Sequence, residues 1–441
     1  MYYLIINILC MLLLASCNNG LDDKHTILAN EIKNDDRMEH VRKMAYELIK
    51  TGFNAGTLYN EVWIRDYNTF INISCDVMDH DNIKKPLLTF LKFQGEDGNI
   101  IDGFIPKEKS GSVGYKYIFS DNAPDYAGHK NSVETDQESS LIQAFYKYIK
   151  KTGDKSILDE NVAGKTVLER LELALNFLFT HRFSEQFGLI WGATTADWGD
   201  VQPEHEWGVV LDENSHLSID IYDNAMLLIA LNNFIEMVKT QQKKSRWTQV
   251  RDELKTNIRK HLWDAKRNKF IPHLYLNGSP FPEDFHEHNL YFHGGTAVAI
   301  EAGLLSKEEI AKVNTWMLNN QQAAHAQSIG LTIYPPYPKG FFKNPSMYPY
   351  GYQNGGDWTW FGGRMIQQLI RYGFVKEAYQ EIKPMINRVL HNNGFFEWYT
   401  PDGKPNGAGD YKGSAGVLAE AIDMLQSWAD ETLHSSGSMK L

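Results

Sequence analysis

The sequence has few cysteines and no cluster of basic residues. Cysteine occurs three times in 441 residues, and only Cys75 lies beyond the N-terminal stretch, so a framework of structural disulfides is excluded. Lysine and arginine total 44 against 55 aspartates and glutamates, which gives a net charge of −11. Because nucleic-acid-binding proteins neutralise phosphates with clustered lysine and arginine, we expect no nucleic-acid partner.

The sequence signatures of several enzyme classes are also missing. The chain has no G-x-S-x-G turn, no phosphate-binding P-loop and no dinucleotide-binding glycine fingerprint. His286, His288 and His293 lack the helical spacing of a zinc protease. The acidic residues between 121 and 138 lack the spacing of an EF-hand, which leaves a bound calcium without support. We therefore expect no cofactor and no catalytic metal.

One short apolar run occupies residues 2–14, and no other stretch is apolar and long enough to cross a bilayer. The run ends in Leu14-Ala15-Ser16-Cys17, which resembles a bacterial lipoprotein signal, although no lysine or arginine precedes it. The resemblance implies that 1–17 is a signal peptide, that Cys17 is lipidated and that 18–25 is a tether. It also implies a lipid-anchored protein of the cell envelope, on the periplasmic or outer-membrane face. A buried N-terminal helix is the alternative.

Apolar spacing and helix-breaking residues predict about twelve helices. No strand–helix–strand rhythm is present, and short extended pieces, such as 188–191 and 270–275, are expected as hairpins within loops. Short connections alternate with long ones rich in glycine, aromatic and acidic residues. The predicted helices are 26–51, 66–78, 82–93, 134–151, 155–181, 217–239, 242–263, 293–302, 306–320, 356–372, 374–391 and 413–432.

This alternation predicts an all-α fold in which six helical hairpins form a ring, an (α/α)6 toroid with long active-site loops on one face. We expect a single catalytic domain at 26–434 and a flexible tail at 435–441. A helical solenoid is the alternative, but the chain contains no repeat of fixed period.

Every second predicted helix opens with acidic, aromatic or glycine-rich residues. Acidic residues cap helices and complement the helix dipole, but capping does not explain the accompanying tryptophans, tyrosines and Gly-Gly pairs. Since aromatic rings stack on sugar faces, we expect the six helix openings to line one carbohydrate-binding cleft. The openings are 61–67, 134–138, 218–224, 293–296, 354–360 and 394–416.

Two of the loops supply carboxylates suited to sugar chemistry. Glu397 stands among four aromatic residues, where partial desolvation would raise its pKa. Asp197 and Asp200 flank Trp198, and either could be a general acid, although an Asx-turn in a surface loop is the alternative. Glycoside hydrolysis uses two such carboxyls, one to protonate the leaving oxygen and one to activate water.

Four motifs together resemble the six-hairpin glycosidases, above all the processing α-glucosidase and mannosylglycerate hydrolase family. The amylo-α-1,6-glucosidase part of glycogen debranching enzymes and the alkaline invertases are also similar. Residues 354–360 are similar to the Asn-Gly-Gly-x-Trp-Pro segment of these enzymes, and 397–403 to their Glu-x-Tyr-x-Pro-x-x-Gly stretch, one residue shorter at the turn. Trp198-Gly199-Asp200 resembles their Trp-Met-Asp, and residues 63–66 resemble their Trp-x-Arg-Asp.

The resemblance implies an inverting, exo-acting α-glycosidase, with a glucosidase favoured, in which Asp200 is the general acid and Glu397 the general base. Asp197 stays a rival acid because Gly199 replaces the family's methionine. Inversion requires carboxyls roughly 6.5–9.5 Å apart. The expected partners are a carbohydrate substrate and, through the lipid, a membrane. The expected sugar-binding residues are Trp63, Arg65, Asp66, Glu134, Asp136, Trp198, Asp220, Tyr222, His293, Asn354, Gly355, Asp357, Trp358, Trp360, Trp398 and Tyr399.

Two other functions remain compatible with the sequence. One is a surface glycan-binding lipoprotein that retains the cleft without catalysis. The other is a polysaccharide lyase or sugar epimerase on the same toroid, which would need cleft-side cations that are scarce here.

Overall fold

The computed structural model describes residues 23–111 and 116–438. The predicted signal peptide with Cys17, and most of the predicted tether, lie outside the described residues. Within those residues, no helix combines the length and apolarity needed to span a membrane.

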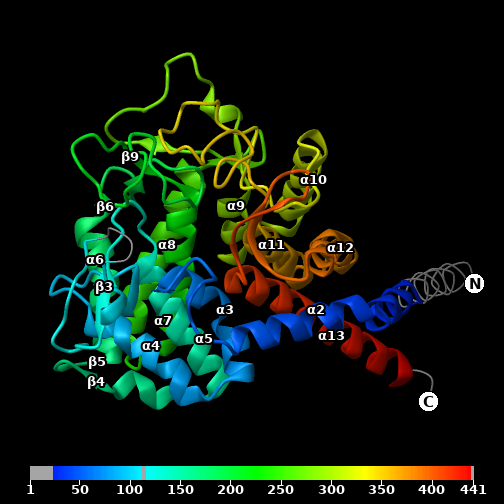
Figure 1. Ribbon diagram of the computed structural model, residues 1–441, viewed down its shortest axis with the longest axis horizontal. Coiled ribbons are helices and arrows are strands. Elements are labelled where there is room, and N and C mark those ends of the chain that lie inside the picture. The colour runs from blue at the N-terminus through cyan, green and yellow to red at the C-terminus, as the bar shows by residue number, and fades with distance from the viewer. Residues whose placement is uncertain (1–22, 112–115, 439–441) are drawn as a thin grey trace, which may run out of the picture.

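Twelve of the described helices form an inner and an outer ring, and Figure 1 shows where they lie in the molecule. Each inner helix contacts the next, and the last contacts the first, so the inner ring is closed. This arrangement confirms the predicted (α/α)6 toroid, and the inner helices are those predicted from their polar openings. The inner ring comprises α3 (Ile64–Val77), α5 (Gln137–Thr152), α7 (Ile221–Met237), α9 (His293–Glu301), α11 (Thr359–Arg371) and α13 (Lys412–Ser438). The outer ring comprises α2 (Asp36–Ile49), α4 (His80–Lys92), α6 (Val167–His181), α8 (Gln241–His261), α10 (Lys307–Ala323) and α12 (Val375–Asn392).

The two rings differ in how their residues are buried. Residues 221–231 of the inner helix α7 are all buried, whereas the outer helix α8 buries only Trp247, Leu254 and Ile258 among its described residues. A helix that is apolar on all sides must be surrounded, and one with a single apolar stripe packs with its other side in water. The sequence therefore sorts helices between the rings through the width of their apolar faces.

Most predicted helices match the observed ones, and two differ. The helix predicted at 26–51 is interrupted at Asn34, because the Asp35 carboxylate accepts a hydrogen bond from the Arg37 N–H and begins α2 as its N-cap. The helix predicted at 155–181 begins as a short 3-10 turn, η2 (Lys155–Asp159), followed by a hairpin. Thr166 then starts α6 with a capping box.

The helix α13 continues to Ser438, so it extends into the segment predicted as a flexible tail.

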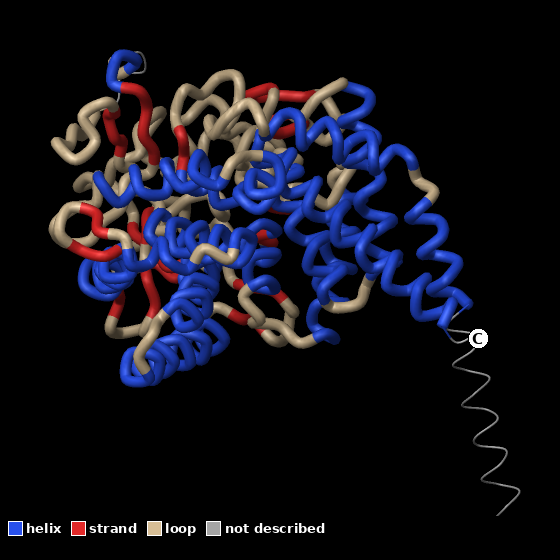
Figure 2. Tube along the Cα trace, turned by 90° about the horizontal axis from the view of Figure 1, so that it is seen from below, coloured by secondary structure: helices blue, strands red, loops and turns tan. Residues whose placement is uncertain are grey.

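Short strands lie in the connections between helices (Figure 2), and all described strands except β4 (Asn161–Val162) and β5 (Lys165–Thr166) lie between an outer helix and the next inner helix. They tie together the loops at the N-terminal ends of the inner helices. These strands are β1 (Val62–Trp63), β2 (Gly103–Pro106) and β3 (Tyr126–His129) in one sheet; β8 (Gly192–Ala193), β9 (Leu217–Ile219) and β12 (Leu274–Tyr275) in another; and the pairs β6 (Phe183–Ser184) with β7 (Leu189–Ile190), β10 (Trp263–Asp264) with β11 (Lys269–Phe270), β13 (Tyr291–Phe292) with β14 (Ile333–Tyr334), and β15 (Phe396–Tyr399) with β16 (Pro405–Gly409).

Candidate active site

Glu397 lies on β15, at the N-terminal end of the inner ring, and is 4% exposed. Its Oε1 accepts a hydrogen bond from the Tyr59 hydroxyl (2.9 Å), and its Oε2 accepts one from the Ala408 N–H (2.8 Å). Gly407 has a φ of +70° and passes so close that a Cβ there would lie 2.3 Å from Oε2. Burial, reinforced by the charges of nearby carboxylates, raises the pKa of Glu397 to about 7 in spite of these donors.

Asp200 faces the same space from a different loop, the one between α6 and α7. It is half-buried, and its Oδ1 accepts a hydrogen bond from Nε2 of Gln353 (2.7 Å), which lies in the loop before α11. The negative charge of Asp200 helps to raise the pKa of Glu397 and that of Asp66. Two carboxyls from separate loops therefore lie close enough for their charges to interact, and we call the space around them the cleft.

Asp197 occupies a different position although it is only three residues away. It adopts the left-handed conformation (φ 57°), and its carboxylate accepts hydrogen bonds from the N–H groups of Gly294 (2.7 Å) and Gly295 (2.9 Å). These are the first residues of α9, where backbone N–H groups lack helical partners and an anion is favoured. Asp197 therefore links its loop to the start of α9.

Arg65 is occupied by protein partners. Its Nε donates to Asp136 (2.7 Å), one terminal nitrogen donates to the Trp198 carbonyl (3.2 Å), and the other pairs with Glu134. The Tyr222 hydroxyl also donates to Asp136 (2.8 Å), and both of these residues are buried. Arg65 therefore joins the start of α3 to the segment before α5 and to the α6–α7 loop. The contact with a sugar that the resemblance implies for Arg65, Asp136 and Tyr222 stays a prediction.

Three tryptophans expected to stack on sugar are instead packed together. Trp198, Trp358 and Trp360 are at most 2% exposed. The ring of Trp198 stacks on Phe361 (4.4 Å between centroids) and meets Trp358 edge-on (4.7 Å). The indole N–H of Trp358 donates to the Tyr352 carbonyl (2.9 Å). The three rings therefore form one buried aromatic cluster around Trp198.

Replacing Trp358 with alanine is therefore expected to destabilise the fold by about 3–5 kcal/mol, the usual range for removal of a buried large aromatic ring. Denaturant unfolding measures this loss, and Trp358→Phe should retain most of the stability. Unchanged stability combined with a raised KM would show that the ring contacts substrate.

The remaining predicted residues fall into two groups. One group holds the loops in place through hydrogen bonds or ion pairs, as Asp357 does with Arg388 (2.9 Å) and as Asp220 does by capping α7. Its other members are His293, Asn354, Gly355 and Tyr399. Trp398 instead packs its ring edge-on against Tyr352 and pairs with Asn406 in the β15–β16 hairpin. The second group lies around the cleft and comprises Trp63, Asp66 and Glu134.

Several residues of the cleft could not be identified from the sequence alone. Tyr59 and Gln353 hydrogen-bond the two candidate catalytic carboxyls, and Tyr411 hydrogen-bonds Asp66, whose pKa burial raises to about 6. Asp102 lies beside the neutral ring of His129, and burial next to the negative charges of Asp136 and Asp200 raises the pKa of Asp102 to about 8. Each of these residues acts on a partner from a distant part of the chain, so no local pattern marks them.

The described residues contain no group of side chains that could hold a metal ion. His286 and His288 are exposed, while Glu287 between them accepts hydrogen bonds from Tyr275 (2.7 Å) and Tyr337 (2.6 Å). Within the acidic stretch before α5, Glu134 pairs with Arg65.

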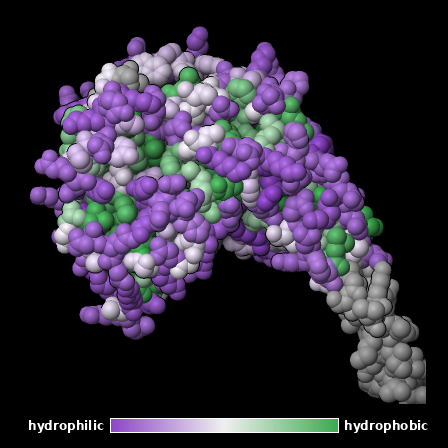
Figure 3. All heavy atoms as spheres, turned by 60° about the horizontal axis from the view of Figure 1, so that its bottom comes forward, coloured by the Kyte–Doolittle hydropathy of each residue, from purple (hydrophilic) through white to green (hydrophobic). Residues whose placement is uncertain are grey.

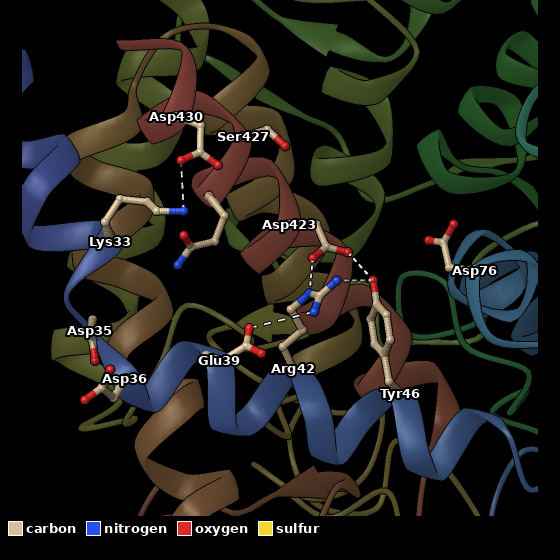
Figure 4. Close-up of a pocket in the computed structure, with 11 residues that line it drawn as sticks. Lys33, Asp35, Asp36, Glu39, Arg42, Tyr46, Asp76, Asp423, Ser427 and Asp430 are labelled. Atoms are coloured by element: carbon tan, nitrogen blue, oxygen red, sulfur yellow. Dashed lines mark hydrogen bonds and ion pairs between the residues drawn. The ribbon is translucent and has the colours of Figure 1, made fainter. Parts of the chain in front are cut away.

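A pocket of about 740 Å³ lies at the other end of the inner helices (Figure 4). It is lined by residues of segment 33–46, which includes much of α2, by Asp76 at the end of α3 and by residues 423–430 of α13, whereas the cleft lies at the N-terminal ends of the inner helices. Lys33 pairs with Asp430, and Arg42 pairs with Asp423. This pocket is separate from the candidate active site.

The comparisons with known proteins agree with this geometry. A family model described as "Glycosyl hydrolase 94 superfamily, catalytic domain" matches residues 41–393, ending just before Glu397. No match was found among curated proteins.

Three solved structures are similar in fold. GH63 mannosylglycerate hydrolase from Thermus thermophilus, in complex with glucose, is 15% identical with a TM-score of 0.60, over 88% of this chain and 99% of that one. The same enzyme in complex with Tris and D-glycerate is 14% identical with a TM-score of 0.62, over 86% of this chain and 99% of that one. A rhamnosidase from Klebsiella oxytoca with rhamnose bound is 14% identical with a TM-score of 0.58, over 88% of this chain and 63% of that one.

Proposed function

Because the chain belongs to the glycosyl hydrolase 94 superfamily, we propose that it is an inverting, exo-acting α-glycosidase of the glucosidase type. Membership and the similar folds make the protein a glycoside hydrolase and confirm the predicted likeness to six-hairpin glycosidases. The finer assignment depends on the two carboxyls of the cleft.

The observation that carries this proposal is that the carboxyls of Glu397 and Asp200 lie in different environments. A pKa of about 7 suits a general base that works near neutral pH, because the group can take up a proton and release it again. Glu397 would remove a proton from water, which attacks the anomeric carbon from the face opposite the leaving group. Among the described residues, Gln353 alone donates a hydrogen bond to Asp200, through Oδ1, which leaves Oδ2 open to take up a proton. In the protonated form, Asp200 would pass this proton to the departing oxygen as the glycosidic bond breaks.

The buried contacts next to Asp200 support exo action. The rings of Trp198 and Trp358 pack together and Arg65 donates to the Trp198 carbonyl, two residues before Asp200, so we infer that this side of the cleft is closed. A cleft that is closed at one end accepts the end of a glycan and excludes its middle.

The proposal is tested by incubating the protein with aryl α-glucosides, aryl α-mannosides and α-linked disaccharides, while proton NMR follows the first sugar released. The β-anomer of the terminal sugar is expected to appear first. Release of the α-anomer would show retention, and an unsaturated product absorbing in the ultraviolet would show a lyase.

The Tyr59 hydroxyl is expected to set the lower pH limit of activity. Its hydrogen bond stabilises the Glu397 carboxylate and lowers the pKa of that group, against the opposite effect of burial. The base must be ionised, so kcat/KM should fall as the pH drops below about 7. In Tyr59→Phe the fall in kcat/KM should begin at a higher pH than in the wild-type protein. If the pH profile does not change, another group controls the fall.

We also propose that the protein is anchored to the cell envelope by a lipid on Cys17, a residue outside the described part of the chain. The resemblance of residues 14–17 to a lipoprotein signal supports this location. The Cys17→Ala variant should leave the membrane fraction. Retention of the variant in that fraction would contradict the proposal.

A further inference from the structure

Exposed large hydrophobic side chains gather on the loops around the cleft. Hydrophilic residues dominate the surface in view, and hydrophobic ones occur in small groups (Figure 3). Of those exposed in the described residues, all but Ile27 and Trp316 lie between an outer helix and the next inner helix. They are Leu58, Ile118, Phe119, Trp207, Val210 and Tyr348.

Trp207 is the most exposed of them, at 69%, and it lies on the same α6–α7 loop as Asp200. Backbone and side-chain hydrogen bonds fix this loop. The Ser132 N–H donates to the Val209 carbonyl (2.7 Å), and the Gln202 side chain donates to the Val210 carbonyl (3.1 Å). The backbone of this loop is therefore anchored, while the indole of Trp207 stays exposed to water.

Tyr348 is 45% exposed on the loop before α11, which packs against the loop of Trp207. The Lys343 N–H donates to the Pro203 carbonyl (3.1 Å), and Val201 packs in the same hydrophobic cluster as Met347. The loop of Tyr348 also provides Gln353, the donor to Asp200. The two exposed rings thus belong to the two loops that hold the proposed acid.

We propose that Trp207 and Tyr348 form a stacking platform for the leaving-group side of the substrate, which is a neutral oligosaccharide extending beyond its first glycosidic bond. The inference rests on the proposed function, because it takes Asp200 as the acid that meets the departing oxygen. Pyranose rings stack on aromatic faces, and a platform beside the acid contacts the sugars that leave.

The negative charge around Asp200 disfavours acidic glycans in this role. Asp200 interacts electrostatically with Asp66, Asp102 and Glu397, while Arg65 already pairs with Glu134 and Asp136. A uronate or sulfate bound next to Asp200 would be repelled by these carboxylates, and Arg65 is already paired with two of its own acidic partners.

The test compares two substrates in the same variants. The substrates are an α-linked tetrasaccharide, maltotetraose or α-mannotetraose, and the matching α-glycosyl fluoride, which has no leaving-group sugar. Trp207→Ala should lower kcat/KM on the tetrasaccharide about 10-fold, since one aromatic contact contributes up to about 1.5 kcal/mol, and leave the fluoride unchanged. Tyr348→Ala should act in the same way but less strongly, about 3-fold.

Trp316→Ala is the matched control, since this tryptophan is 46% exposed on the outer helix α10. It should alter neither substrate. An equal loss on both substrates in Trp207→Ala would show a structural role, and no loss on either would overturn the platform.

Calorimetry separates failure of the platform from failure of the proposed function. The same two tetrasaccharides are titrated into Glu397→Gln and into Glu397→Gln with Trp207→Ala. About 10-fold weaker binding in the double variant supports the platform even if the wild-type protein hydrolyses neither sugar. Equal affinities, or no binding of either tetrasaccharide, overturn it even if hydrolysis of shorter substrates is found.

Discussion

Glu397→Gln is expected to abolish hydrolysis of every substrate, with a fall in kcat of about 10²–10⁴-fold or more, the usual contribution of a general base. The amide keeps the size of the side chain and can still hydrogen-bond Tyr59 or Ala408, but it cannot accept a proton from water. Substrate binding should persist. Steady-state kinetics on aryl glycosides, with calorimetric binding in parallel, measures both effects.

A buried glutamate outside the cleft provides a matched control for this substitution. Glu381 on α12 is 8% exposed, accepts a hydrogen bond from Asn314 (2.7 Å), and burial raises its pKa to about 7, as for Glu397. Glu381→Gln should leave kcat unchanged. If the wild-type protein binds sugars without hydrolysing them and Glu397→Gln changes nothing, the protein is a glycan-binding member of its fold.

The toroid could be predicted because it depends on local patterns. Inner helices such as α7 are apolar on every side, outer helices such as α8 have one stripe, and both patterns can be counted along the chain. The interruption before α2 was missed since a single carboxylate, that of Asp35, ends one helix and caps the next. The apolar spacing on either side of it continues without a break.

The roles of individual cleft residues were harder to predict. An arginine beside a cleft can bind a sugar or hold neighbouring acids, and the choice for Arg65 depends on Glu134 and Asp136, which are about 70 residues away. A tryptophan in a helix opening can stack on substrate or on other rings, and Trp358 does the latter. The role of Glu397 was easier to predict because its aromatic neighbours are adjacent in sequence. The desolvation of its carboxyl could therefore be expected from the local sequence.

Two acids three residues apart differ in their contacts, and these contacts predict different kinetic signatures. Asp197 holds the N–H groups of Gly294 and Gly295, so Asp197→Asn should weaken the start of α9 and lower stability by about 0.5–2 kcal/mol, as for a lost N-cap. Its activity should fall by the same factor on all substrates. Thermal unfolding and kinetics on a series of aryl glycosides measure these effects.

Asp200→Asn should instead show a loss that grows with the basicity of the leaving group. Disaccharides need a proton on the departing oxygen, so their kcat should fall about 10²–10⁴-fold. Glycosyl fluorides and nitrophenyl glycosides leave with little protonation and should lose far less. If this dependence follows Asp197 instead, the two roles are exchanged. If neither variant shows the dependence while turnover persists, another carboxyl supplies the proton. Asp102 is then the strongest candidate, because its pKa of about 8 keeps it protonated at neutral pH and it lies close enough to Asp200 for their charges to interact.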